Sequence, residues 1–204
     1  MSIATNLCKL VVAGTVAAMA GIAAAQTFPS RPITIIVPFP PGGVTDPVAR
    51  MVGQRMSENV RQPVLVENKP GASGIIAAEF VKKSPADGYT VFFGFTGSQS
   101  VNPSLYSKLP YDPEKDFQPV TAIINTKHIL VVPASSPAKS AADLVAMAKA
   151  DPKGLNYASQ GVGAGGHLLG EMLKTKTGAN LSHIAYKGSA PAVTDLLAGR
   201  VDLL

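Results

Sequence analysis

Two glycine-rich segments hold the residues whose types and spacing could bind a ligand. The first is residues 38–46 (PFPPGGVTD) and the second is residues 159–167 (SQGVGAGGH). Each follows an apolar run and precedes residues at helical spacing, so each is expected to join a strand to a helix. The unpaired N–H groups that open a helix, beside glycines that let the backbone come close, form a ready anion site. An ordinary strand-to-helix turn is an equal alternative for the first segment taken alone.

The second segment also satisfies a nucleotide-binding pattern. Gly161, Gly163 and Gly166 have the G-x-G-x-x-G spacing of dinucleotide-binding loops. The strand expected next, residues 181–186, ends at Lys187 and offers no acid for the ribose, and the motif lies deep in the chain. We therefore favour carboxylate binding over nucleotide binding. A glycine loop that only packs a helix tightly on a strand remains a further alternative.

Signals for catalysis are weak. There is no G-x-S-x-G motif, and His167 and Leu168 stand where a P-loop would have Lys and Ser or Thr. The histidines are far apart in the sequence, and we interpret them as isolated. His167 and Glu171 are four residues apart and could share a metal, but we prefer a pair on a helix surface. We expect no catalytic residue, no metal and no cofactor.

The composition restricts the class of protein. The chain has 204 residues, 46% of them hydrophobic and 15% charged, which suits one or two compact domains. Its formal net charge of +5 comes from scattered basic residues, so no nucleic-acid partner is expected.

Residues 1–25 have the features of a signal peptide. Lys9 precedes an apolar stretch, and Ala23 and Ala25 fit a cleavage site before Gln26. An uncleaved membrane anchor is the alternative. Removal of this segment takes away Cys8, the single cysteine of the chain. We expect a periplasmic protein that begins at Gln26 and has no disulfide.

The first half of the mature chain alternates strands with helices. Strands are expected at residues 33–37, 64–67 and 89–95, and Asp46 is expected to cap a helix whose first residue is Pro47. Such alternation predicts a parallel sheet, in which ligands bind beyond the carboxyl ends of the strands. Residues 38–46 and 96–100 would then line one crevice.

The second half repeats this pattern after two extended runs, residues 119–125 and 128–133, with a crossing between them at Thr126 and Lys127. Strands are expected at residues 155–159, 181–186 and 201–204. Helices are expected from Ser140, over 167–176 and over 191–198. We expect domain 1 at residues 26–125 and domain 2 at residues 126–204. The chain stops inside an apolar run, so we expect both domains to be incomplete and the chain to be truncated.

Several segments, in order, resemble signatures of one family, the solute-binding receptors of tripartite tricarboxylate transporters, also called Bug receptors. They are FPSRPITIIVPFPPGGVTDPVAR, NKPGASGIIAAEFV, SPADGYTVFFG, VNPSLY, YASQGVGAGGHLLGEML and HIAYKGSAPAVTDLLAGRVDLL. The match runs from about residue 28 to residue 204. The resemblance implies an α/β, two-domain periplasmic-binding-protein fold of type II-like form. Each domain would be a sheet flanked by helices, and the second crossing and the C-terminal part would be missing.

The resemblance also implies ligand-binding residues on three loops. In the first loop they are Phe39 as a wall of the pocket, Pro41, Gly42 and Gly43 as backbone contacts to one carboxylate, and the polar pair Thr45 and Asp46. Ser98 lies on the loop after the third strand. In the second domain they are Ser159, Gly161, Gly163, Ala164 and Gly165, which would grip the carboxylate from the other side.

Two departures from the family pattern leave the ligand unspecified: Ala164 stands where a hydroxyl residue is common, and Gln99 where His is frequent. Neither glycine segment contains Lys or Arg, so neutral dipoles would bind the carboxylate. Asp46 is either a helix cap or a ligand contact.

The resulting hypothesis is a receptor, not an enzyme. It would capture a small carboxylate, namely a di- or tricarboxylate, an amino acid or an aromatic acid, between two domains that close on it. Its partners would be that ligand and the membrane subunits of a tripartite tricarboxylate-type transporter, or a sensor protein, and the receptor would be a monomer. The alternative is an exported α/β enzyme that binds a nucleotide at residues 161–166.

Overall fold

The computed structural model describes residues 27–204, so the expected signal peptide and the cleavage site before Gln26 lie outside the described residues. Pro32–Leu204 forms one compact unit that carries every described helix and strand, and residues 27–31 belong to a separate unit. Within residues 27–204, no helix is long and apolar enough to cross a membrane.

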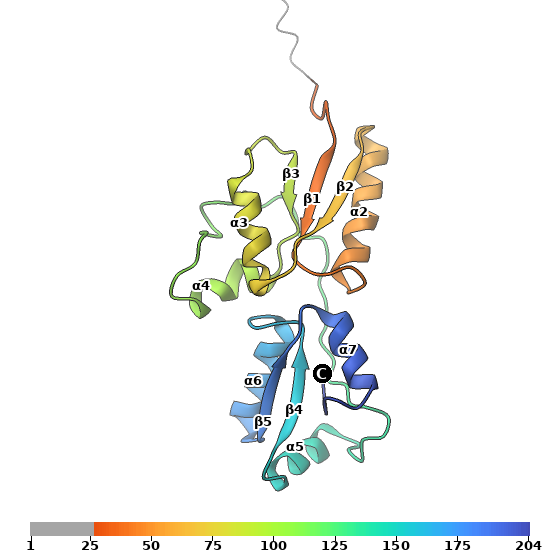
Figure 1. The fold of residues 1–204 in the computed structure, drawn as a ribbon, viewed down its shortest axis with the longest axis vertical. Coiled ribbons are helices and arrows are strands. Elements are labelled where there is room, and N and C mark those ends of the chain that lie inside the picture. The colour runs from red at the N-terminus through yellow and green to blue at the C-terminus, as the bar shows by residue number, and fades with distance from the viewer. Residues whose placement is uncertain (1–26) are drawn as a thin grey trace, which may run out of the picture. The chain divides into compact units, whose positions relative to one another are not determined.

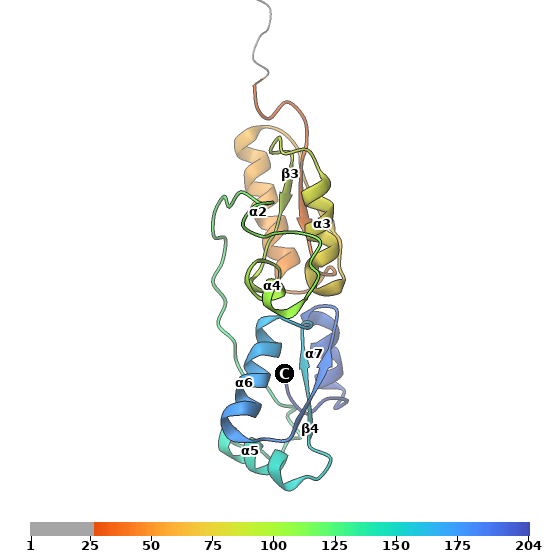
Figure 2. The same cartoon turned by 90° about the vertical axis from the view of Figure 1, so that its left-hand side faces the viewer.

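The first sheet contains three parallel strands in the order β2-β1-β3 (Figure 1). They are β1 (Ile33–Val37), β2 (Val64–Asn68) and β3 (Thr90–Phe92). The central strand is almost wholly buried, as expected for a β-branched run in a parallel sheet. α2 (Thr45–Val60) and α3 (Ile75–Lys83) connect these strands and cover opposite faces of the sheet (Figures 1 and 2).

The third strand is shorter than expected. It ends at Phe92 rather than at Phe95, although the Phe93 N–H still donates to the Ile36 carbonyl oxygen at 2.9 Å. β1 itself ends at Val37, and Pro38 has no N–H to continue the ladder. After β3 the chain forms a π-helix, η2 (Gly97–Val101), and then α4 (Asn102–Leu105).

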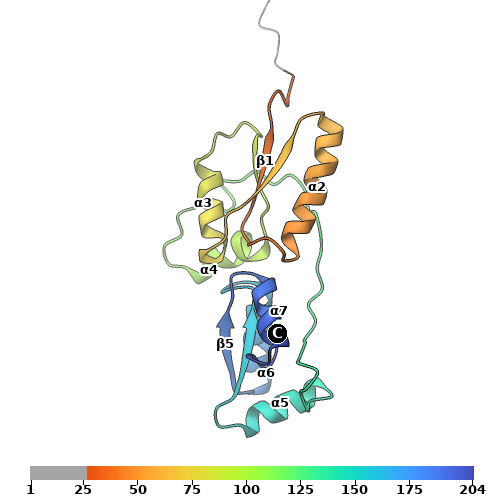
Figure 3. The same ribbon diagram turned by 45° about the vertical axis from the view of Figure 1, so that its right-hand side comes forward.

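No helix or strand is present between α4 and α5 (Ala141–Ala150) in the described chain (Figure 3). The two runs expected to be extended lie in this segment, and neither joins a named sheet. Val131 and Leu204 nevertheless exchange both backbone hydrogen bonds, at 3.0 and 2.9 Å, which is the pattern of an antiparallel pair.

The second sheet pairs β4 (Leu155–Ser159) with β5 (Leu181–Ala185) in parallel. The strand expected at residues 201–204 is present only as a single parallel bridge from Leu203 to Tyr157. α6 (Gly165–Thr177) and α7 (Ser189–Leu197) each begin two residues earlier than expected. Both helices follow strands of this sheet, so their first turns lie just beyond the strand ends.

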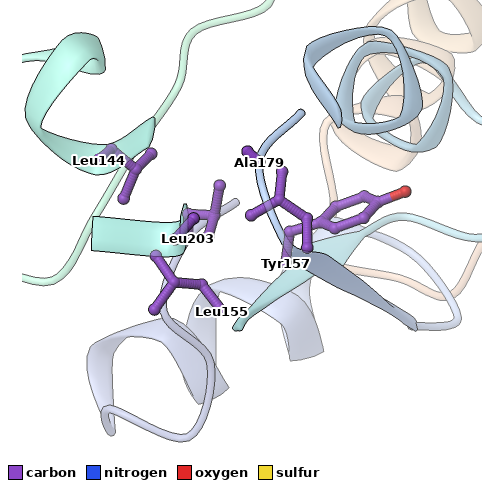
Figure 4. Packing of buried hydrophobic residues seen from close by; sticks show 7 residues of the cluster. Leu144, Leu155, Tyr157, Ala179 and Leu203 are labelled. Carbon is purple, nitrogen blue, oxygen red and sulfur yellow. The ribbon is translucent and has the colours of Figure 1, made fainter. Parts of the chain in front are cut away.

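All β4 residues except Asn156 are buried, although the sequence of the strand, LNYAS, mixes apolar and polar residues. Leu155 and Tyr157 pack with Leu144, Ala179 and Leu203 (Figure 4). Ala158 belongs to a second cluster with residues of α7. β4 therefore holds α5 and α7 in place, and the loop that follows β4 is anchored at its start.

Candidate functional site

A cavity of about 310 Å³ lies beyond the carboxyl ends of strands from both sheets. This is the position at which parallel sheets bind ligands. Its volume is at the small end of the range for ligand pockets. Its walls come from the loops after β1, β3, β4 and β5 and from the segment between α4 and α5. The lining residues are Phe39, Pro40, Gly43, Val44, Thr45, Phe93, Gly94, Phe95, Thr96, Ile124, Thr126, Lys127, His128, Gln160, Ala164, Gly165, Lys187, Gly188, Ser189, Ala190 and Pro191.

The sequence-predicted site residues divide into two groups. Phe39, Gly43, Thr45, Ala164 and Gly165 line the cavity. Residues outside its lining are Pro41, Gly42, Asp46, Ser98, Ser159, Gly161 and Gly163. The second group belongs to the same loops, so its effect on a ligand would pass through the backbone that it shapes.

Three helices begin at the cavity. Thr45 opens α2, Gly165 opens α6 and Ser189 opens α7, and all three line the cavity. The first N–H groups of a helix have no intrahelical acceptor, and no N-cap side chain of these helices supplies one. Together with the helix dipoles, these N–H groups favour an anion at this place.

Two lysines add positive charge to the lining, and a histidine stands beside one of them. Lys127 and His128 come from the segment between α4 and α5, and Lys187 follows β5. None of the described lining residues is Asp or Glu. The expectation that only neutral dipoles would bind a carboxylate is therefore incomplete, because it considered the two glycine segments alone.

Aromatic rings provide the apolar part of the wall. The rings of Phe39 and Phe95 are tilted by 60° with centroids 4.8 Å apart, and both residues line the cavity with Ile124. A ligand with charged ends and an apolar middle would match this combination of surfaces.

Asp46 does not cap α2, contrary to the expectation. The N-cap residue is Val44, and α2 begins at Thr45, before Pro47. The buried Asp46 carboxylate accepts two hydrogen bonds from Arg50, both at 3.0 Å, and one from the Asn68 amide at 2.9 Å. Pairing with the Arg50 guanidinium, the Asn68 amide and the Gly42 N–H lowers the pKa of Asp46, although burial opposes the shift. The carboxylate thus ties the first glycine loop to the adjacent strand.

Ser98 is fully buried, and its hydroxyl group serves its own turn. It donates to the Phe95 carbonyl oxygen at 3.0 Å and accepts from the Phe95 N–H at 3.2 Å. The Ser98 carbonyl oxygen accepts from the Tyr111 hydroxyl at 2.6 Å. These contacts fix the loop whose neighbours, Phe95 and Thr96, line the cavity.

Several N–H groups of the second glycine loop are already used within the loop. The Gly161 N–H donates to Ser159 Oγ at 3.2 Å, and the Ala164 N–H donates to the Gly161 carbonyl oxygen at 3.1 Å. The Gly163 N–H donates to His167 Nδ1 at 3.1 Å. The N–H groups that remain for an anion are therefore those at the start of α6.

The three histidines gather around this loop, so the interpretation that they are isolated is wrong. Ser159 Oγ lies 2.7 Å from His183 Nε2, and the rings of His183 and His167 stack at 4.2 Å. His128 packs so closely against Gly165 that a Cβ atom there would lie 2.5 Å from its Nε2. Burial and the neighbouring His167 lower the pKa of His183.

The Glu171 carboxylate is hydrogen-bonded to a side chain of β4. Its Oε1 accepts from the Tyr157 hydroxyl at 2.8 Å, and this bond lowers the pKa of Glu171. Burial and the same carboxylate raise the pKa of Tyr157. Among residues 27–204, no group of three His, Cys, Asp or Glu side chains is arranged to hold a metal.

Sequence reasoning missed the contributions of Lys127, His128, Lys187 and Ser189. One signal was available for the last two. β5 pairs in parallel with β4, so the loops after both strands must reach the same edge of the sheet. Lys127 and His128 gave no local signal, because their place depends on the path of a segment without regular structure.

Comparisons with known proteins show the family of this chain. The model of the tripartite tricarboxylate transporter family receptor, TctC, matches residues 48–204. Protein BugT of Bordetella pertussis is 41% identical over 196 residues, which cover 94% of this chain and 60% of BugT.

Two solved structures have the same fold. Rpa4515 of R. palustris, solved with adipate, is 43% identical with a TM-score of 0.83, covering 86% of this chain and 59% of that one. MatC from Rhodopseudomonas palustris, solved with bound malate, is 32% identical with a TM-score of 0.81, covering 86% and 60%. These structures confirm the expected α/β periplasmic-binding-protein fold.

The chain spans about 57–60% of the length of the first curated relatives that it matches. The matched family is one of transporter receptors, which supports a receptor over the nucleotide-binding enzyme considered from the sequence. The chain belongs to the tripartite tricarboxylate transporter receptor family, as its motifs predicted.

Proposed function

We propose that this chain is the ligand-capturing part of a periplasmic receptor for a small dicarboxylate. The observation that carries the proposal is the lining of the cavity. Three helix N-termini and the side chains of Lys127, His128 and Lys187 face it, and no described carboxylate does. Charge-assisted hydrogen bonds from such donors are about twice as strong as neutral ones.

The same lining narrows the choice among carboxylates. An amino acid carries an ammonium group, which would have no described acid to pair with and would face Lys127 or Lys187. A dicarboxylate can place its two carboxylates against the helix N-termini and the lysines, and its methylene groups against Phe39 and Phe95. Relatives solved with adipate and with malate support this ligand class.

The wider function rests on the family. We propose periplasmic capture of the dicarboxylate between domain 1 (residues 26–125) and domain 2 (residues 126–204), as a monomer. Delivery would be to the membrane subunits of a tripartite tricarboxylate-type transporter. The relatives that are described as periplasmic support this location.

A thermal-shift and calorimetry screen tests the proposal. Adipate and malate should raise the unfolding temperature, whereas the matched amino acid glutamate and the nucleotides NAD and ATP should not. Saturation at about 100 times Kd would stabilise the protein by about 2.7 kcal/mol. Stabilisation by a nucleotide but not by dicarboxylates would overturn the proposal.

A matched pair of variants localises the site. Lys187→Gln should weaken adipate binding about 5- to 20-fold, because it removes a charge from the lining. Lys153→Gln makes the same change in charge on a turn outside the lining and should leave Kd within about twofold. Equal effects of the two would place the ligand elsewhere.

A further inference from the structure

The second glycine loop is fixed to its helix by an imidazole. His167 is the third residue of α6, and its Nδ1 accepts the N–H of Gly163, one residue before the N-cap Ala164. Capping boxes use a Glu or Gln at this helical position to reach back to the start of the helix. Here the acceptor is a side chain that can gain a proton near neutral pH.

The backbone conformation and the close neighbours of Gly163 both favour glycine at this position. This residue has φ +76°, and an added Cβ would lie 3.2–3.5 Å from Leu105, Asn102 and Val101. The carbonyl oxygen of Gly163 is also close to Gly97. The bond to His167 thus secures the residue at which this loop meets the η2–α4 segment, two residues before Gly165 lines the cavity.

The hydrogen bond requires a neutral imidazole. Nδ1 can accept only while it carries no proton, and a protonated ring would turn an N–H toward the Gly163 N–H. His183 stacks on His167 at 4.2 Å, so two charged rings would also repel each other.

The other charged and titratable groups around His167 are few in the described chain. Glu171 and Lys174 lie on the same helix, and their side chains pair at 3.7 Å. Tyr157 on β4 donates to Glu171, and His183 comes from β5. His128 packs on Gly165 at the start of the helix. Glu171 is the acid among them, and it is shared between Tyr157 and Lys174.

We propose that His167 is a positioning residue of the ligand site. In its neutral form it holds Gly163 and thereby the start of α6 in the shape that faces the cavity. Proton uptake releases that bond, and the receptor then binds its anion less tightly. The effect on affinity rests on the proposed dicarboxylate function, whereas the hold on the loop does not.

Nuclear magnetic resonance on the whole chain without ligand tests the hold on the loop. The ring ¹⁵N shifts should report an unprotonated Nδ1 at pH 8 and show at which pH it gains a proton. The protection factor of the Gly163 amide, which compares its exchange rate with the intrinsic rate at the same pH, should fall as Nδ1 gains its proton. A Gly163 amide that ignores this titration, or an Nδ1–H tautomer at pH 8, would overturn the proposal.

Titration with adipate tests the effect on affinity. His167→Asn supplies an acceptor oxygen near the place of Nδ1 that does not titrate, and His167→Phe supplies none. At pH 7.5 the Asn variant should bind within about twofold of the wild type, and the Phe variant about 3- to 10-fold more weakly. The ratio of wild-type Kd to His167→Asn Kd should rise from about 1 at pH 7.5 to about 3–10 at pH 5.5.

This ratio is the decisive quantity, because the ionisation of adipate is common to both proteins and cancels, and the same pair of titrations in a His183→Asn background removes the coupling between His183 and His167. A ratio that stays constant with pH would overturn the role of His167 in affinity. Absence of adipate binding in every variant would instead refute the dicarboxylate function, and the amide experiment would still decide the hold on the loop.

Discussion

The two glycine-rich loops at the cavity are stabilised by different chemistry. The first is tied by Asp46, which binds the Arg50 guanidinium and the Asn68 amide. The second is tied by imidazoles, with His167 on Gly163 and His183 on Ser159. A carboxylate with a lowered pKa keeps its charge throughout the neutral range, whereas an imidazole does not. The bonds that hold the first loop therefore persist throughout the neutral pH range, whereas the bonds that hold the second loop depend on pH.

Asp46→Ala should have the largest effect on this comparison. It removes the acceptor of Arg50 Nε and of the Gly42 N–H, and it takes one of two acceptors from the Asn68 amide, so we expect a loss of about 2–3 kcal/mol in the free energy of unfolding. Urea denaturation gives this value. Asp46→Asn, which keeps one acceptor oxygen, should lose less. Exchange of the Gly163 amide should not change, and acceleration there would mean that the two loops are not independent.

Replacing one glycine in each loop by alanine tests how closely neighbouring atoms surround that glycine. Gly163→Ala should lower the free energy of unfolding by about 2 kcal/mol, since the positive φ is unfavourable and the added Cβ would lie 3.2 Å from its nearest neighbouring atom. Gly42→Ala has φ +86° but nothing within 4 Å, so the expected cost is about 1 kcal/mol. Urea midpoints of the two variants measure the difference, and equal values would show that crowding at Gly163 is relieved.

Acid should weaken the second loop before the first. The folded pKa of His183 lies below its ordinary value of 6.5, so the unfolded chain takes up the proton first and stability falls as pH drops through about 6.5. We expect the free energy of unfolding to fall between pH 7.5 and 5.5. The folded pKa of Asp46 lies below 3.8, so its contribution is complete above that pH and is lost only below it.

Urea midpoints at the two pH values check this order, with His183→Asn as the matched variant. That variant should lose less stability between pH 7.5 and 5.5 than the wild type does. An identical loss in both proteins would assign the dependence to another group.

Arg50→Lys should have the smallest effect. Lysine cannot reproduce the two-pronged contact, but the Arg50 side chain is half exposed, so solvent screens the pair. We expect a cost of about 0.5 kcal/mol and an unchanged Kd for adipate. A change in affinity would bring the Asp46 pair into the site, which its absence from the lining argues against.

Local sequence patterns predicted the parts of the fold that depend on local physics. Apolar β-branched residues gave β1 its observed bounds, and the glycine segments do join strands to helices. The capping rule failed at Asp46, because α2 already begins at Thr45 and the carboxylate is taken by Arg50 and by Asn68, which is 22 residues away. Sequence spacing likewise could not reveal the histidine cluster, since β5 brings His183 beside α6 only after the sheet forms.

The candidate site was predicted in outline and not in its charges. The edge of each sheet follows from parallel topology, so Gly43 and Gly165 could be anticipated. Lys127 and His128 could not, because a segment without a regular repeat gives no indication of which side chains turn inward.

The paired bonds between Val131 and Leu204 anchor one end of an irregular segment. They tie residue 131 to the end of the chain, which is itself bridged to β4 through Leu203. On the other side, Phe117 packs on Phe92 of β3, with ring centroids 5.6 Å apart. Residues 118–130 therefore form a segment without helix or strand between two anchored points. Lys127 and His128 lie in this segment, so the places of these two lining residues depend on the anchors at both of its ends.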